Sequence, residues 1–177
     1  MTRWDELFGD LEGQAASLDS LRQAGEVAEV TRAEQAAISL VERLREVVGA
    51  AIKVELRDGE MLSGQLRRVA EQWLLLDGNS LRGHVEHLIP LPAVSAVSPL
   101  TRRAHPSVRV TDSLGLGSAL RGLQRDRAAV VLSTSGGQVS GRLSRVGKDH
   151  VDVTPGDIPG AEPQTVRFAA LLRVSQP

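Results

Sequence analysis

Hydrophobic residues recur at helical spacing in the first part of the chain and at every second position in the rest. Residues 4 to 48 contain no proline, and the pattern over this segment predicts helix. A capping-box sequence from Thr31 to Glu34 fits the start of a new helix, so one long helix and a helical hairpin both remain open. The apolar positions that define the pattern are Trp4, Leu7, Phe8, Leu11, Ala15, Leu18, Leu21, Ile38, Val41, Leu44 and Val48.

After Gly49 the apolar positions alternate with polar ones, which predicts β-strands. Asp58 and Gly59 stand between the first two strands, and an Asp-Gly pair flanked by alternating apolar residues is a strong hairpin signal. The alternating positions include Ile52, Val54, Leu56, Leu62, Leu66, Val69, Leu74 and Leu76.

The sequence of the strand region occurs twice in the chain. A shift of 77 positions aligns Gly64 with Gly141, and two glycines fall in register in each copy, which periodicity alone does not explain. The other identical pairs include Val54 with Val131, Gly59 with Gly136, Ser63 with Ser140, Leu66 with Leu143, Arg68 with Arg145, Gly83 with Gly160 and Val97 with Val174. We therefore predict an internal duplication.

A candidate helix precedes each copy, from about residue 31 to 48 and from about 113 to 124, with Asp112 or Ser113 as the N-cap of the second. The expected organisation is an acidic amphipathic helix over residues 1–30, a first barrel with its leading helix over 31–98, a linker over 99–111 and a second barrel with its leading helix over 112–177.

The segment from Val54 to Leu66 resembles the first motif of the Sm-like family, a hydrophobic residue followed by x-Leu-x-Asp-Gly and then x-Gly-x-Leu. The second copy keeps Val131, Gly136, Val139, Gly141 and Leu143. The resemblance implies an α+β fold in which an N-terminal helical segment precedes two tandem Sm-like (SH3-like) five-stranded β-barrels, each preceded by a helix. Gly64 and Gly141 are the expected bends of the second strands.

Sm-like proteins typically form rings through their outer strands and bind RNA through an Asp and an Asn that follow the second strand. Ala70 and Leu74 occupy those places in the first copy, and Gly147 and Val151 occupy them in the second. None of these side chains makes the required hydrogen bonds, so the resemblance implies the fold without the family's RNA pocket.

Composition narrows the classes of protein further. The chain has no Cys, which removes disulfides and thiolate chemistry, and aromatic residues make up only 2%, which disfavours base stacking. No apolar run is long enough for a membrane span, and the N-terminus does not resemble a signal peptide, so we expect a cytoplasmic protein that does not bind membranes. Residues 1–48 carry 10 acidic and 5 basic side chains, and residues 49–177 carry 12 and 16.

Candidate catalytic and metal-binding residues are sparse. His84, Glu86 and His87 form the one cluster that resembles metal ligands, but on a strand His87 points away from the other two. We therefore predict a protein that is not an enzyme and needs neither metal nor cofactor.

Two kinds of partner remain. The first is RNA, held by basic surface residues: Arg67, Arg68, Arg102, Arg103, Arg142, Arg145 and Lys148. The second is a protein, either another chain or a second copy, bound by barrel edges and by the N-terminal apolar stripe of Trp4, Leu7, Phe8, Leu11 and Leu18. The tandem organisation also predicts a homo-oligomer, with three chains supplying six barrels to a ring.

Overall fold

The computed structural model describes residue 29 and residues 35–80, 83–101, 114–156 and 160–176. The chain divides into two compact units, Met1–Ser39 and Leu40–Pro177. Both copies of the duplicated sequence lie in the second unit.

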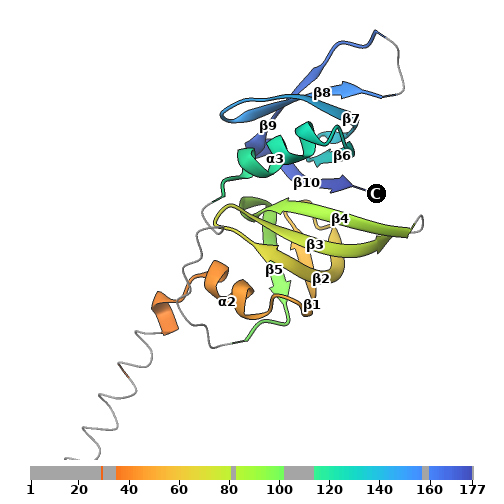
Figure 1. Cartoon of the computed structure of the whole chain (residues 1–177). Coiled ribbons are helices and arrows are strands. Elements are labelled where there is room, and N and C mark those ends of the chain that lie inside the picture. The colour runs from red at the N-terminus through yellow and green to blue at the C-terminus, as the bar shows by residue number, and fades with distance from the viewer. Residues whose placement is uncertain (1–28, 30–34, 81–82, 102–113, 157–159, 177) are drawn as a thin grey trace, which may run out of the picture. The chain divides into compact units, whose positions relative to one another are not determined.

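In the described part of the second unit, ten strands and two helices make up most of the chain (Figure 1). The first copy contains α2 (Leu40–Glu46), β1 (Ala51–Leu56), β2 (Met61–Val69), β3 (Trp73–Ser80), β4 (Gly83–Pro90), the 3-10 turn η1 (Leu91–Ala93) and β5 (Val94–Ser98). The second copy contains α3 (Leu116–Arg125), β6 (Ala129–Thr134), β7 (Gly137–Val146), β8 (His150–Pro155), β9 (Gln164–Arg167), η3 (Phe168–Ala170) and β10 (Leu171–Gln176).

The strands form one antiparallel sheet in the order β5-β1-β2-β3-β4-β10-β6-β7-β8-β9. The predicted fold, two tandem five-stranded barrels each preceded by a helix, is therefore wrong. Each copy does supply five strands, but β4 of the first copy pairs with β10 of the second, so the ten strands form a single open sheet. Figure 1 shows β10 lying beside β4. We call this β4–β10 pairing the joint.

Strand pairing within the second copy repeats that within the first. The ladder between β2 and β3 is irregular between Leu66 and Arg68, and that between β7 and β8 is irregular at the equivalent Leu143 and Arg145. One difference corrects the sequence alignment. Val54 pairs with Leu62, whereas Val139 pairs with Leu132 and not with Val131, so the turn of the second hairpin has one residue fewer.

Gly64 and Gly141 lie where the next strand comes too close for any side chain. A Cβ on Gly64 would overlap the carbonyl oxygen of Asp77, and a Cβ on Gly141 would overlap that of Thr154. Glycine at both positions allows the second and third strands of each copy to approach this closely.

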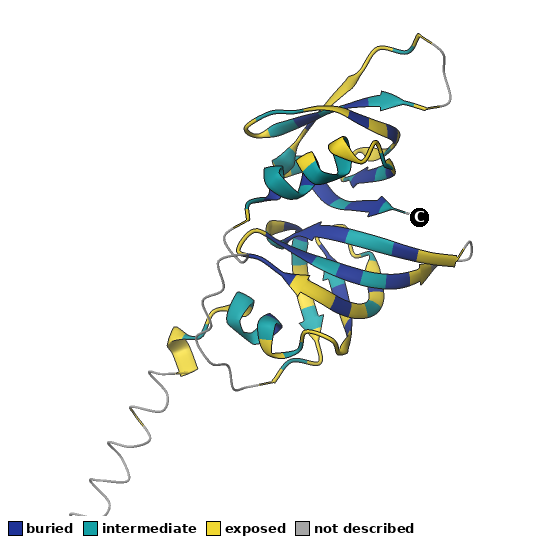
Figure 2. Cartoon of the chain, in the orientation of Figure 1, coloured by how far each residue is buried: buried dark blue, intermediate teal, exposed yellow. Residues whose placement is uncertain are grey.

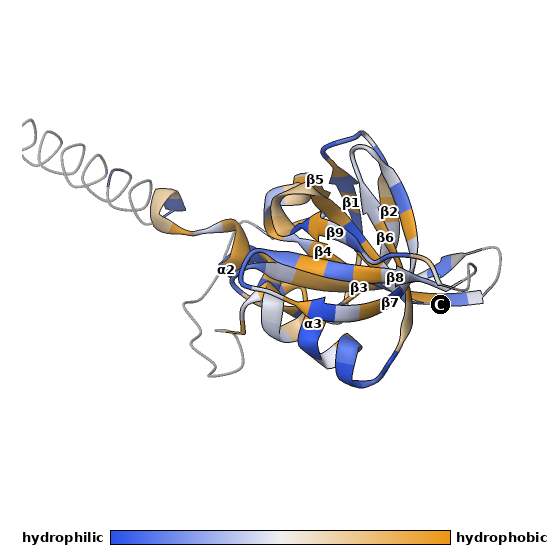
Figure 3. Ribbon diagram, turned by 90° about the horizontal axis from the view of Figure 1, so that it is seen from above, coloured by the Kyte–Doolittle hydropathy of each residue, from blue (hydrophilic) through white to orange (hydrophobic). Residues whose placement is uncertain are grey.

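The hydrophobic residues form two clusters, which meet at the joint. One contains mainly first-copy residues but includes Leu172 of β10. The other contains mainly second-copy residues but includes Ala70, Trp73 and Leu88. Figure 2 shows β10 as mostly buried, and Figure 3 shows hydrophobic and hydrophilic segments alternating along the strands. Each cluster thus borrows side chains from the other copy, which ties the two together.

The helices are shorter than predicted. Residues 35–37 are helical, Ile38 and Ser39 are not, and α2 then covers only Leu40–Glu46, so a single unbroken helix up to Val48 is wrong. The second leading helix is confirmed as α3, although its N-cap is Gly115. Leu44 and Leu120 are the fully buried side chains through which α2 and α3 pack. The prediction for residues 1–28 lies outside the described residues.

Candidate functional site

The joint aligns three residues of β4 with three of β10. Leu88 lies opposite Val174, His87 opposite Ser175, and Glu86 opposite Gln176. The His87 Nδ1 and Ser175 Oγ share a hydrogen bond of 2.9 Å. The joint therefore combines a backbone ladder with an aliphatic pair and a partly buried polar pair.

His87 is kept neutral in this environment. Burial, together with the nearby Arg173 guanidinium, lowers the pKa of His87 from 6.5 to about 4. The Arg173 side chain is itself paired with Glu60 across the two copies. At neutral pH the joint thus contains an uncharged imidazole rather than a buried cation.

Contacts beyond the strands hold α3 against the first copy. The indole Nε1 of Trp73 donates to the carbonyl oxygen of Leu114 at 2.9 Å, and the backbone N–H of Leu116 donates to the Gln72 Oε1 at 3.0 Å. Trp73 is only 4% exposed, because the sheet and α3 together cover its ring. The first turn of α3 is thereby fixed to the β2–β3 turn.

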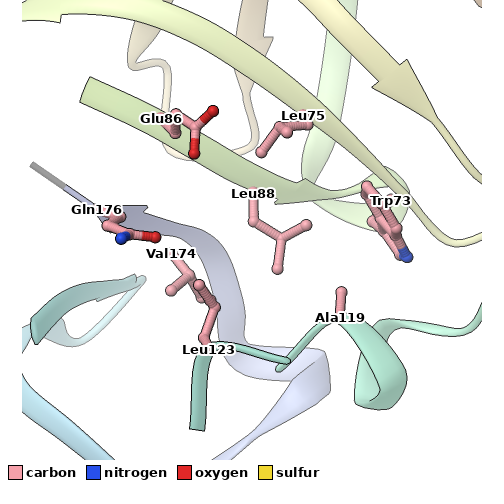
Figure 4. A pocket seen from close by; sticks show the side chains of 8 residues that line it. All are labelled: Trp73, Leu75, Glu86, Leu88, Ala119, Leu123, Val174 and Gln176. Carbon is pink, nitrogen blue, oxygen red and sulfur yellow. The ribbon is translucent and has the colours of Figure 1, made fainter. Parts of the chain in front are cut away.

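An apolar groove of about 170 Å³ remains beside the joint (Figure 4). Side chains from β3 and β4 face side chains from α3 and β10 across it, and the two polar side chains lie at its β4 and β10 ends. The lining residues are Trp73, Leu75, Glu86, Leu88, Ala119, Leu123, Val174 and Gln176. The groove exists only because the two copies are joined.

A second, larger hollow lies where the turns of the two copies meet. Its volume is about 470 Å³, and its lining includes Arg57, Gln72, Leu91 and Phe168. The Arg57 guanidinium donates to the carbonyl oxygen of Ala169 at 3.2 Å, which bridges the two copies on this side.

The sheet ends in β5 on one side and β9 on the other. Among the described residues, β5 pairs only with β1, and β9 pairs only with β8. No other strand of the described chain covers the outer side of β5 (Val94–Ser98). Unpaired backbone groups at such an edge accept an additional strand.

The predicted RNA-binding arginines are placed on separate strands. Arg67 and Arg68 are exposed on β2, Arg142 and Arg145 are exposed on β7, and Lys148 is exposed beyond β7. Arg67 Nε is 3.8 Å from Asp77 Oδ2, and Arg145 stands opposite Asp152 in the β7–β8 ladder. Arg102 and Arg103 lie outside the described residues, as do Trp4, Leu7, Phe8, Leu11 and Leu18.

The histidine cluster is divided between different partners. His84 Nδ1 lies 3.0 Å from Asp77 Oδ1 near the β3–β4 turn, whereas His87 faces Ser175 in the joint. In the described part of the chain, no group of three His, Cys, Asp or Glu side chains is arranged to hold a metal ion. Nor does any described helix have the length and apolar character needed to cross a membrane.

The residues of the joint were not predicted from the sequence. A usable signal was the unequal character of equivalent positions, because Trp73, Leu75 and Leu88 are apolar while their counterparts His150, Asp152 and Thr165 are polar. Such a difference between otherwise matching copies marks a surface that is buried in one copy and exposed in the other.

Comparison with known proteins finds no matching family model and no matching curated protein. The Sm-like resemblance of residues 54–66 therefore stays a prediction from the sequence.

Proposed function

We propose that this protein is a non-catalytic interaction protein that binds a partner protein by adding a strand to its sheet. The observation that carries the proposal is the joint itself, where the edge of one copy already binds a strand of the other. The equivalent edge of the first copy, β5, has no strand on its outer side among the described residues. Main-chain hydrogen bonds supply affinity in this mode of binding, and side-chain pockets supply selectivity.

A capture experiment tests this function. The full chain, the edge variant Ser95→Glu with Ser98→Glu, and the control Gln164→Glu on β9 are each immobilised and exposed to nuclease-treated extract. Charges on an edge strand oppose strand addition, so the wild type and the control retain the same protein in stoichiometric amount and the edge variant loses it. Retention of no protein, or equal retention by all three, contradicts strand addition at β5.

RNA binding is the second candidate, because exposed arginines stand at equivalent places in both copies, Arg68 on β2 and Arg145 on β7. Phosphate contacts need only cations on the surface and weaken as salt rises. RNA binding predicts a raised 260/280 nm absorbance ratio after purification at low salt without nuclease. It also predicts weaker binding of an RNA oligonucleotide by Arg68→Glu with Arg145→Glu. A protein-like ratio at low and high salt argues against RNA.

A further inference from the structure

The joint supplies a template for what β5 binds. β10 presents Val174 and Ser175 to β4, and β5 has Val97 and Ser98 at the equivalent positions. On their other sides, β5 and β10 are paired in the same way. Ser98 lies opposite Lys53 of β1, and Ser175 lies opposite Val131 of β6. The β1–β5 and β6–β10 ladders are also irregular at the same place. β5 therefore offers an added strand the same two side chains, on the same backbone framework, as β10 offers β4.

The outer edge of β5 carries neither charge nor proline, and the one irregularity in its ladder with β1 lies at Ser95, before Val97 and Ser98. Val94–Ser98 contains no charged residue and no proline, and its exposed residues are Ser95, Ala96 and Ser98. Proteins commonly protect exposed edges with lysines, prolines or bulges. The first proline follows at Pro99, which lies at the position of Gln176 and limits the added ladder at that end.

A second copy of this chain does not match the template. The described sheet of a second copy offers two edge strands, β5 and β9. In β5 an alanine precedes each of the valines Val94 and Val97, so no hydrogen-bonding side chain would meet Ser98. In β9, Thr165 and Gln164 stand where Leu88 and His87 stand in β4. Pro163 replaces Glu86 and has no backbone N–H to donate. Beside this strand, a polar surface that includes the 2.6 Å hydrogen bond from Thr165 to Asp152 replaces the apolar surface of the joint.

We propose that the β5 edge binds an extended antiparallel segment of a different protein. The segment places a large aliphatic residue opposite Val97 and a hydrogen-bonding side chain, such as histidine, opposite Ser98. This specificity rests on the proposed function and adds to it the chemistry of the partner. The two sheet ends then differ in role, since β5 binds and β9 does not.

The probe is a synthetic peptide with the sequence of residues 84–90 of this chain, His-Val-Glu-His-Leu-Ile-Pro, which carries the β4 side chains. It is titrated into the ¹⁵N-labelled full chain and followed by nuclear magnetic resonance. We expect shifts in the amides of β5 with none in those of β9. A peptide with aspartate at the Leu88 position is the matched negative probe, and it leaves the spectrum unchanged because a carboxylate then faces Val97.

Two protein variants complete the test. Ser98 is exposed and lies opposite Lys53, so Ser98→Glu places its carboxylate beside an ammonium group and preserves the fold. It weakens peptide binding about tenfold, equivalent to about 1.4 kcal/mol, because the added strand desolvates the new charge. Gln164→Glu on β9 leaves binding unchanged. Shifts at β9 or β10 in place of β5, no shifts, or equal affinity in Ser98→Glu would each overturn the proposal.

Failure here is distinguishable from failure of the proposed function. If the peptide does not bind at β5 but the edge variant still loses its captured partner, strand addition stands and the inferred partner sequence is wrong. If the peptide does not bind at β5 and the edge variant retains the same protein as the wild type, both proposals are wrong.

Discussion

Gly64 and Gly141 occupy sites where backbone from the adjacent strand fills the space that a side chain would need. Both were singled out from the sequence as bends of the second strands, and the structure shows that backbone also approaches closely there. The importance of Trp73 and Leu88 was not predictable in this way. An apolar residue on a strand has the same local pattern whether it packs within its own copy or against the other.

Gly64→Ala tests the close approach. The added methyl group meets the Asp77 carbonyl, which has no flexible atom to move aside, so we expect a loss of about 1–3 kcal/mol in the free energy of unfolding. Gly122→Ala on α3 is the matched control, since open space surrounds its Cβ position and alanine favours a helix by about 0.5–1 kcal/mol. Urea unfolding measures both. Equal stabilities for Gly64→Ala and the wild type would show that the strands separate readily.

His87 makes stability depend on pH. Its pKa of about 4 in the folded protein lies below the unfolded value of 6.5, so the unfolded chain binds more protons between these values. The free energy of unfolding therefore falls as the pH drops from 6.5 towards 4. His87→Asn cannot be protonated in this range and should lose less stability between pH 6.5 and pH 4.5 in urea titrations. Equal losses in the two proteins would mean that His87 is not buried in the joint.

At the scale of elements, the alternating pattern predicted the strands, their hairpins and their repetition. It did not predict that a strand of one copy pairs with a strand of the other. The hydrogen-bonding groups of β4 are backbone atoms that any antiparallel strand satisfies, so the sequence pattern does not reveal which strand is its partner. The deciding feature is the apolar surface of Trp73, Leu75 and Leu88, which α3 and β10 of the second copy cover.

Trp73→Ala tests the contact between the first copy and α3. The change removes a nearly fully buried ring and the hydrogen bond to Leu114, and we expect it to cost about 3–5 kcal/mol. Denaturant unfolding followed by circular dichroism measures the loss. His150→Ala, at the equivalent place in the second copy, is the control and should cost much less because His150 is only half-buried. Similar costs for the two variants would mean that Trp73 has no special role at the joint.

At the scale of the whole molecule, the joint makes one folding unit from two copies. The clusters share side chains across it, and Arg173 of β10 pairs with Glu60 of the first copy. Residues 40–177 should therefore unfold in one cooperative transition. Circular dichroism and amide exchange of β1 and β7 should report the same midpoint in denaturant. Two separate midpoints, one for each copy, would show that the copies fold independently.

The most direct measurement is the detection of nuclear Overhauser effects between backbone protons of β4 and β10 in the full chain. The joint predicts cross-strand effects between the pairs Leu88 with Val174 and Glu86 with Gln176, as strong as those between β3 and β4. Such contacts would establish the interface on which both the groove and the template for β5 depend. Effects confined to strand pairs within each copy would contradict the single sheet, and with it the proposed mode of binding.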